Sequence, residues 1–235
     1  MKKDKVVVEI WSDVVCPFCY IGKNELEKAI HKLNAEDQVE IVWHSYQLDP
    51  NFPKGQAITS TKYLSERKGI PLAQVEAMSS QLAQQGKEYD IDFKFDKALS
   101  FNTFDAHRLI QWAKTQNKSH ELKTALMNAY FSQAINLSES DKLLQVVSAV
   151  GLDIKEAEEL LKSDKFSDAV EEDIYQSRQL GIRGVPFFLI NESASISGAQ
   201  ADQVFEASIA AAIKNLESQE KSANEGMCLP SGICE

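Results

Sequence analysis

Two cysteines separated by two residues stand at the junction of a predicted strand and a predicted helix, and this junction constrains the fold most. Residues 5–11 are rich in β-branched side chains, and their run of three valines predicts a strand buried on both faces, in the middle of a sheet. Residues 24–33 carry apolar side chains at helical spacing. Cys16 and Cys19 lie between them, and Pro17 suits the first position of a helix because its missing N–H would have no partner there. The pattern predicts an α/β fold with Cys16 at a helix N-terminus.

The position of the two cysteines also predicts how they react. Unpaired N–H groups and the positive end of the helix dipole favour a thiolate at a helix N-terminus. We therefore expect the pKa of Cys16 to lie below the ~8.5 of a free cysteine, so that Cys16 is the attacking sulfur. Cys19 lies one turn further along and nearer the interior, where it is expected to stay a thiol and to resolve the mixed disulfide. The Cys-Pro-Phe-Cys segment is thus interpreted as a redox-active center for thiol–disulfide exchange.

A second close pair of cysteines, Cys228 and Cys234, lies at the other end of the chain. Two pairs could form a four-thiolate zinc site, but five residues separate Cys228 from Cys234, whereas zinc-binding pairs are usually about two to four residues apart. We therefore predict no metal site and no cofactor, and we interpret the second pair as a candidate auxiliary redox pair. A small local disulfide and a zinc-dependent binding module without catalysis stay open as alternatives.

The charge and hydropathy of the chain exclude several classes of function. Its 235 residues include 25 Lys and Arg against 35 Asp and Glu, which gives a net charge of −10. Such a surface repels phosphate backbones and anionic lipids, so neither nucleic acid nor a membrane is an expected partner. The longest apolar stretch, residues 185–190, is far shorter than the ~20 residues that span a bilayer. No apolar segment of a signal peptide follows the basic start, so we expect a cytoplasmic protein.

Pro186 stands at the start of a predicted apolar strand. A proline is unusual there because it cannot donate a hydrogen bond to a neighbouring strand. A cis Val185–Pro186 bond would turn the chain sharply and leave the backbone of Val185 available to a ligand. A trans proline at the strand start is the alternative, and this segment alone does not decide between the two.

Four stretches together resemble the DsbA type of thioredoxin-fold oxidoreductase, most closely its FrnE-like branch. They are DVVCPFCYIG (13–22), NTFDAHRL (102–109), GIRGVPFF (181–188) and SGAQ (197–200). The resemblance implies a thioredoxin fold interrupted by a large all-helical insertion. Residues 1–56 and 181–218 would form the thioredoxin-like domain, and residues 57–180 the insertion. It also implies that Pro186 is cis and packs against the catalytic cysteines, with the backbone of Val185 contacting the substrate.

The rest of the sequence pattern agrees with such a fold. Residues 39–46 alternate like a second strand, and helical periodicity extends from about residue 59 to residue 180. Residues 191–193 are typical of a hairpin turn, and a last helix is expected over residues 201–217. The polar composition that follows predicts a flexible, cysteine-bearing tail over residues 219–235.

Several positions depart from the family pattern. Phe18 stands where DsbA has histidine, and a phenyl ring cannot hydrogen-bond to a thiolate. Ile10 stands where related proteins often carry a buried acid that relays a proton to the resolving thiol. Asp13 is a candidate for that relay, with a role in the turn as the alternative. His107, within a matching stretch, either faces the active site or is a core or surface histidine.

The resemblance and the paired cysteines predict an enzyme, a protein disulfide oxidoreductase or isomerase. Its partners would be thiol- or disulfide-containing proteins, with glutathione or a thioredoxin-like protein as a further redox partner. Phe101, Phe104 and Trp112 are candidates to line a substrate-facing lid, or else belong to the core. The alternative function is that of a glutathione-dependent small-molecule isomerase or transferase, as in hydroxychromene carboxylate isomerases and kappa-class glutathione transferases. Those relatives keep serine at the position of Cys16, so the two cysteines of this chain favour dithiol chemistry.

Overall fold

A four-stranded sheet forms the frame of the computed structural model, which describes residues 5–225. Its strands, in the spatial order β2-β1-β5-β6, are β1 (Val6–Ser12), β2 (Val39–Ser45), β5 (Phe187–Ile190) and β6 (Ala194–Ser197). β1 runs parallel to β2 and antiparallel to β5, and β5 pairs antiparallel with β6. The predicted central place of β1 is confirmed. Val6 and Val8 on one face are 0% exposed, whereas Val7 and Glu9 on the other face are only half-buried.

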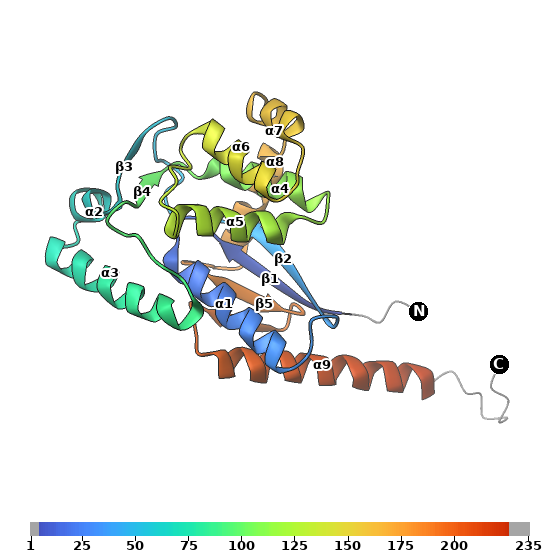
Figure 1. Cartoon of the computed structure of the whole chain (residues 1–235). Coiled ribbons are helices and arrows are strands. Elements are labelled where there is room, and N and C mark those ends of the chain that lie inside the picture. Colours follow the sequence, from blue (N-terminus) through green and yellow to red (C-terminus); the bar gives the residue numbers. More distant parts are fainter. Residues whose placement is uncertain (1–4, 226–235) are drawn as a thin grey trace.

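Two helices pack side by side along the sheet. α1 (Pro17–Lys32) connects β1 to β2, and α9 (Asp202–Glu225) contacts α1, β1 and β5. The rings of Phe188 and Phe205 meet edge to face at 4.8 Å between centroids, which fixes α9 against β5. Figure 1 shows α9 running below the sheet and past its edge. None of the helices in the described part of the chain has the length and apolar character required to cross a bilayer.

The chain between β2 and β5 is mostly helical, as predicted for the insertion. Its elements are β3 (Ala57–Thr59), α2 (Ser60–Lys62), the π-helical turn η1 (Tyr63–Arg67), α3 (Leu72–Gly86), η2 (Lys87–Tyr89), β4 (Leu99–Phe101), α4 (Phe104–Lys114), α5 (Ser119–Phe131), α6 (Ser140–Ala149), α7 (Ile154–Leu161) and α8 (Ser167–Gln179). β3 and β4 pair antiparallel, so the insertion is not wholly helical. The sequence did not reveal these strands because each has only three residues, too few for an alternating pattern.

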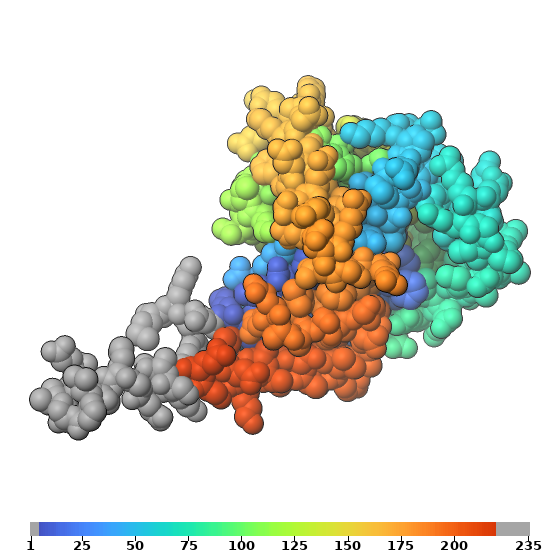
Figure 2. Space-filling model, turned by 180° about the vertical axis from the view of Figure 1, so that it is seen from behind, coloured from blue at the N-terminus to red at the C-terminus, as the bar shows by residue number. Residues whose placement is uncertain are grey.

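Helices α4–α8 of the insertion gather at the β2 edge of the sheet, whereas α3 packs against α1 (Figure 1). α5 and α8 contact β2, and α4 contacts both of these helices. Figure 1 shows α4–α8 above the sheet, and Figure 2 shows α8 running down the middle of the opposite view toward the chain that leads to α9. α8 therefore carries the chain from the insertion back to β5.

The prediction of a flexible tail from residue 219 is wrong for its first part. Helix α9 continues to Glu225. This segment contains good helix formers, the polar Gln, Glu and Lys as well as Ala, and no glycine or proline occurs in it before Gly226. Polarity alone therefore misled the prediction. Cys228 and Cys234 lie outside the described residues, so their role as an auxiliary redox pair stays a prediction.

Glu25 is a buried carboxyl between α1, η2 and the connection that leads to α9. Its side chain is buried, with the residue 2% exposed, and the Tyr89 hydroxyl donates to Oε1 at 3.4 Å. Burial is the main cause that raises the pKa of Glu25 to about 7. The charges of Asp202 and Glu88 add to this rise, although the Gln200 amide and Tyr89 oppose it. The folded protein therefore binds this proton more tightly than the unfolded chain does.

The substitution Glu25→Gln is expected to stabilise the protein above pH 7 and to have little effect near pH 5. A carboxyl whose pKa is raised in the folded state contributes fully to the stability of the folded protein when the pH lies below 4.5, its pKa in the unfolded chain. This contribution is lost as the pH rises through about 7, its pKa in the folded protein. The neutral amide avoids the loss, which is on the order of 2 kcal/mol. Urea unfolding of both proteins across this pH range measures it, and a difference that stays constant with pH would contradict the assignment.

Candidate active site

The two cysteines lie where the sequence placed them, at the start of α1. Cys16 is the N-cap residue with extended backbone (φ −89°, ψ 113°), and Pro17 is the first helical residue. The carbonyl of Cys16 accepts hydrogen bonds from the amides of Cys19 at 3.1 Å and Tyr20 at 3.3 Å, which closes the first turn. The strand–helix junction thus presents both sulfurs at one end of the sheet.

The start of β5 lies directly against this helix turn. The Val185–Pro186 bond is cis, as the resemblance implied, and the thiol of Cys16 donates to the carbonyl of Val185 at 3.5 Å. Gly22 permits the close approach, because a Cβ at that position would meet Pro186 Cγ at 3.1 Å. Residues separated by most of the chain are therefore brought together around one sulfur.

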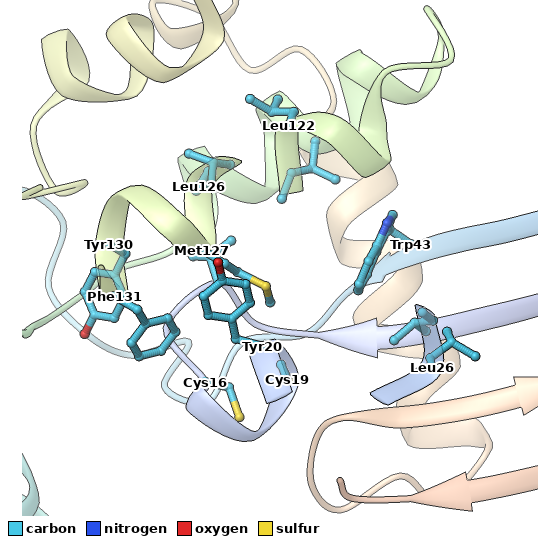
Figure 3. Packing of buried hydrophobic residues seen from close by; sticks show 14 of the residues in the cluster. Cys16, Cys19, Tyr20, Leu26, Trp43, Leu122, Leu126, Met127, Tyr130 and Phe131 are labelled. Atoms are coloured by element: carbon cyan, nitrogen blue, oxygen red, sulfur yellow. The ribbon is translucent and has the colours of Figure 1, made fainter. Parts of the chain in front are cut away.

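Both sulfurs are more buried than an exposed nucleophile would be. Cys16 is 3% exposed and Cys19 is 1% exposed. Figure 3 shows Tyr20 and Phe131 lying close to the start of α1, which carries the two cysteines. Cys16 is nevertheless not sealed in the core, because it lines a cavity of about 360 Å³ between the thioredoxin-like frame and the insertion.

The walls of this cavity are mostly apolar. Besides Cys16 they include Val15, Leu64, Val75, Met78, Leu82 and Phe101. Phe18, Leu48 and Met78 are 42%, 45% and 36% exposed and so form its rim. Of the three aromatic residues expected to line a lid, Phe101 does so, whereas Phe104 and Trp112 are not among the residues of this wall. The cavity gives a partner an apolar approach to the sulfur of Cys16.

The neighbouring sulfur and burial act against the predicted ionisation of Cys16. The hydrogen bond with Cys19 and burial raise the pKa of Cys16 well above its ordinary value. The amide of Cys19 does act in the predicted direction, but it is outweighed. Burial alone would raise the pKa of Cys19, yet the neighbouring thiol of Cys16 and the charge of Lys123 lower it. The prediction of a low Cys16 pKa considered only the backbone at the helix start, and burial and the Cys19 thiol oppose it.

A buried network of ionisable side chains lies behind the cysteines. Asp13 is 1% exposed and accepts hydrogen bonds from the amide of Leu48 at 2.9 Å and from Nε2 of His107 at 3.2 Å. Burial opposes ionisation, but the contacts with His107 and Leu48 and the charge of Lys123 hold the pKa of Asp13 below its usual value. Burial lowers the pKa of His107, so this imidazole is neutral at neutral pH. Asp13 thus has the role of a turn residue through its bond to the Leu48 amide, and its role as a proton relay stays a prediction.

Sequence analysis missed Lys123, which completes the network from helix α5. It is 1% exposed and donates to the carbonyl of Ser12 at 3.1 Å. Burial lowers the pKa of Lys123 to about 8, although the charges of Cys19, Asp13 and Cys16 act in the opposite direction. The available signal was a lysine beside Leu122 and Leu126, on the apolar stripe of a helix that has to be buried.

Comparison with known proteins now places the fold in a family. The family model of the DSBA-like thioredoxin domain matches residues 7–210 of the chain. The chain belongs to this family. Membership confirms the predicted fold and the broad class of thiol–disulfide oxidoreductase, whereas the FrnE-like branch stays a prediction.

This DSBA-like chain is similar to one curated protein in sequence and to several solved structures in fold. The uncharacterized protein YwbO of Bacillus subtilis (strain 168) is 28% identical over 208 residues, which cover 87% of this chain and 96% of YwbO. The crystal structure of the probable DsbA oxidoreductase SCO1869 from Streptomyces coelicolor is 31% identical with a TM-score of 0.84, over 88% of this chain and 89% of that one. A 2-hydroxychromene-2-carboxylate isomerase (HCCA isomerase) has a TM-score of 0.68 at 16% identity, over 92% of this chain and 98% of that one, and shows the fold alone.

The described part of the DSBA-like chain holds no group of three or more His, Cys, Asp or Glu side chains placed to bind a metal ion. Cys16 and Cys19 are free thiols there. The four-thiolate zinc alternative would need Cys228 and Cys234, which the described residues do not include.

Proposed function

We propose that this protein exchanges disulfides with protein clients through Cys16 and Cys19, as a dithiol oxidase, reductase or isomerase of the cytoplasm. The observation that carries the proposal is the Cys16 sulfur, which lies 3.5 Å from the Val185 carbonyl and lines the apolar cavity. A client backbone that enters the cavity would pair with Val185 while its sulfur meets Cys16. Pro17 and Phe18 would form the active-site loop beside it.

The chemistry needs no cofactor beyond the two thiols. A client thiolate attacks Cys16 of the oxidised enzyme, a client–Cys16 disulfide forms, and Cys19 departs as a thiolate. The second client thiolate then attacks the client sulfur of this mixed disulfide, which leaves the client oxidised and the enzyme reduced. The reverse sequence reduces a client disulfide, and a partial sequence isomerises it.

The cavity favours protein clients over glutathione as the main substrate. Its lining includes the carboxylates of Asp13 and Asp49, and among the described residues that form it there is no lysine or arginine. The two carboxylates of glutathione would find no cationic partner there, whereas an apolar client side chain would lose unfavourable contact with water. Glutathione or a thioredoxin-like protein would then serve as the redox partner that regenerates the enzyme.

Reactivation of scrambled ribonuclease, together with the equilibrium between the cysteine pair and glutathione, tests the proposal. We expect catalysed reactivation that depends on Cys16. If the protein leaves scrambled ribonuclease unchanged but conjugates glutathione or isomerises a small aromatic substrate, the alternative function is correct.

The substitution Met78→Glu is expected to lower kcat/KM for a disulfide peptide with apolar flanking residues by about tenfold. The new carboxylate would have to lose water beside the client's apolar side chain, at a cost of about 1–2 kcal/mol. Leu72→Glu is the matched control, because Leu72 is also an exposed apolar residue of α3 but does not line the cavity. Equal losses for the two variants, or none for Met78→Glu, would show that the client does not use this cavity.

A further inference from the structure

Lys123 has surroundings that are unusual for a lysine. Its side chain is fully buried, and Nζ donates to the carbonyl of Ser12 at 3.1 Å and lies 5.5 Å from the ring centre of Trp43. Among the side chains that the structure describes, no carboxylate comes within 4.0 Å of this nitrogen, so Lys123 has no ion pair there. An ammonium has three donors and loses several kcal/mol of hydration on burial, so one carbonyl and one ring do not compensate it.

The groups that face Lys123 narrow the choice of a negative partner. They are Cys16 and Cys19 at the start of α1, Asp13 after β1, and His107 on α4. Asp13 is already engaged with His107 and the Leu48 amide. His107 carries no negative charge in any state. The negative charge that changes with the redox state of the site is that of the sulfurs, and Cys19 acts on Lys123 more strongly than Asp13 or Cys16 does.

We propose that the buried Lys123 ammonium is the counter-ion of the Cys19 thiolate and thereby stabilises the reduced form of the cysteine pair. This inference rests on the proposed disulfide exchange. Lys123 acts through Cys19 and is a positioning residue, supplied to the thioredoxin-like frame by helix α5 of the insertion. Related proteins often carry a buried acid at the position of Ile10, which exchanges a proton with the resolving thiol. This chain does not need that acid, because a Cys19 thiolate stabilised by Lys123 has no proton to give up when it attacks.

The step that Lys123 assists is the breaking of the Cys16–Cys19 bond. As a client thiolate forms its bond to Cys16, the electron pair of the Cys16–Cys19 bond moves to Cys19, whose sulfur leaves as a thiolate beside the ammonium. In the reverse direction this thiolate attacks Cys16 and the client leaves with the electron pair. Asp13 suits a base poorly, since its pKa is held low, so charge stabilisation by Lys123 is the more effective device.

The decisive variant is Lys123→Met, compared in a chain in which Cys228 and Cys234 are serine so that only one cysteine pair titrates. We expect thiolate formation, followed by ultraviolet absorbance, to move to higher pH by about one unit or more. Above the midpoint of that titration, the equilibrium constant for reduction by glutathione is expected to fall about tenfold, which corresponds to a potential about 30 mV more negative. Both changes follow from the loss of a charge that favours the reduced form.

A matched control separates these two shifts from the general effect of removing a buried lysine. Lys23 is 4% exposed and lies on α1, but it pairs with Glu27 at 2.7 Å instead of facing the sulfurs. Lys23→Met is expected to leave the thiolate titration and the equilibrium with glutathione within twofold of the parent. If Lys123→Met also leaves both within twofold, or if both variants shift them equally, the inference is overturned while the proposed function stands.

A measurement on the unsubstituted lysines keeps the test valid if Lys123→Met does not fold. Nitrogen NMR of the lysine side chains in the chain without the tail cysteines should show one ammonium that titrates at lower pH in the disulfide form than in the dithiol form. Identical midpoints in the two forms overturn the inference. If the parent pair does not exchange with glutathione in either direction, the proposed function itself fails, which is a different result from an unchanged Lys123→Met variant.

Discussion

Replacing Cys16 with serine is expected to abolish disulfide exchange, a loss on the order of a thousandfold or more, whereas replacing Cys19 with serine is expected to trap the client. A serine hydroxyl cannot form or break a disulfide, so the first variant has no sulfur that a client can reach through the cavity. In the second variant Cys16 still forms the mixed disulfide, but no neighbouring sulfur resolves it.

Turnover and trapping should be measured in the same experiment. Reactivation of scrambled ribonuclease gives the rate, and electrophoresis without reductant detects the client–enzyme disulfide. The variant Cys228→Ser/Cys234→Ser is the comparison for cysteines outside the α1 helix start. If Cys16→Ser keeps more than about a tenth of the parent rate, the tail or another nucleophile carries the exchange, and the proposed role of Cys16 is wrong.

Local sequence was sufficient to predict the part of this site that depends on neighbouring residues. A strand rich in β-branched residues, Pro17 at the first helical position and apolar residues at helical spacing together predict where Cys16 and Cys19 lie. The signals are strong because each concerns residues within one turn or one strand. The cis geometry at Pro186 needed the family resemblance, since the segment itself left both isomers open.

The properties that the sequence did not predict arise from contacts between distant segments. Lys123 and Cys19 come together only because α5 is folded against the start of α1, and no local pattern encodes that contact. The pKa values of the two cysteines depend on distant contacts in the same way, because burial and, for Cys19, Lys123 act on them as well as the helix start. Helical periodicity predicted that α5 is buried, but not which of its polar residues faces the sulfurs.

The largest loss of stability is expected when the contacts between α8 and the sheet are removed. Asp173 of α8 is 6% exposed and accepts hydrogen bonds from Nδ1 of His44 at 2.7 Å and from the amide of Ser45 at 2.6 Å. The side-chain amide of Gln111 donates to the same carboxylate. The indole of Trp11 stacks on the His44 ring at 4.3 Å and donates to the backbone carbonyl of Asp173 at 3.2 Å. The carboxylate of Asp173 therefore joins strand β2 to helices α4 and α8, and its backbone carbonyl adds β1 through Trp11.

The substitution Asp173→Ala is expected to lower the free energy of unfolding by about 3 kcal/mol. It removes the acceptor of the His44 ring and of the Ser45 amide and leaves the Gln111 amide with Ser45 Oγ alone. An unsatisfied buried donor costs about 1–3 kcal/mol, partly offset where water enters. Urea unfolding at neutral pH measures the change, and Glu171→Ala, an exposed carboxylate of the same helix, is expected to change it by less than about 0.5 kcal/mol. Because α8 leads directly to Val185, the weakened join should also slow exchange with clients more than it changes the glutathione equilibrium of the cysteine pair. A loss of stability no larger than that of Glu171→Ala would mean that the Trp11 hydrogen bond to the backbone carbonyl of Asp173 and the packing of α8, and not the carboxylate, hold α8 to the sheet.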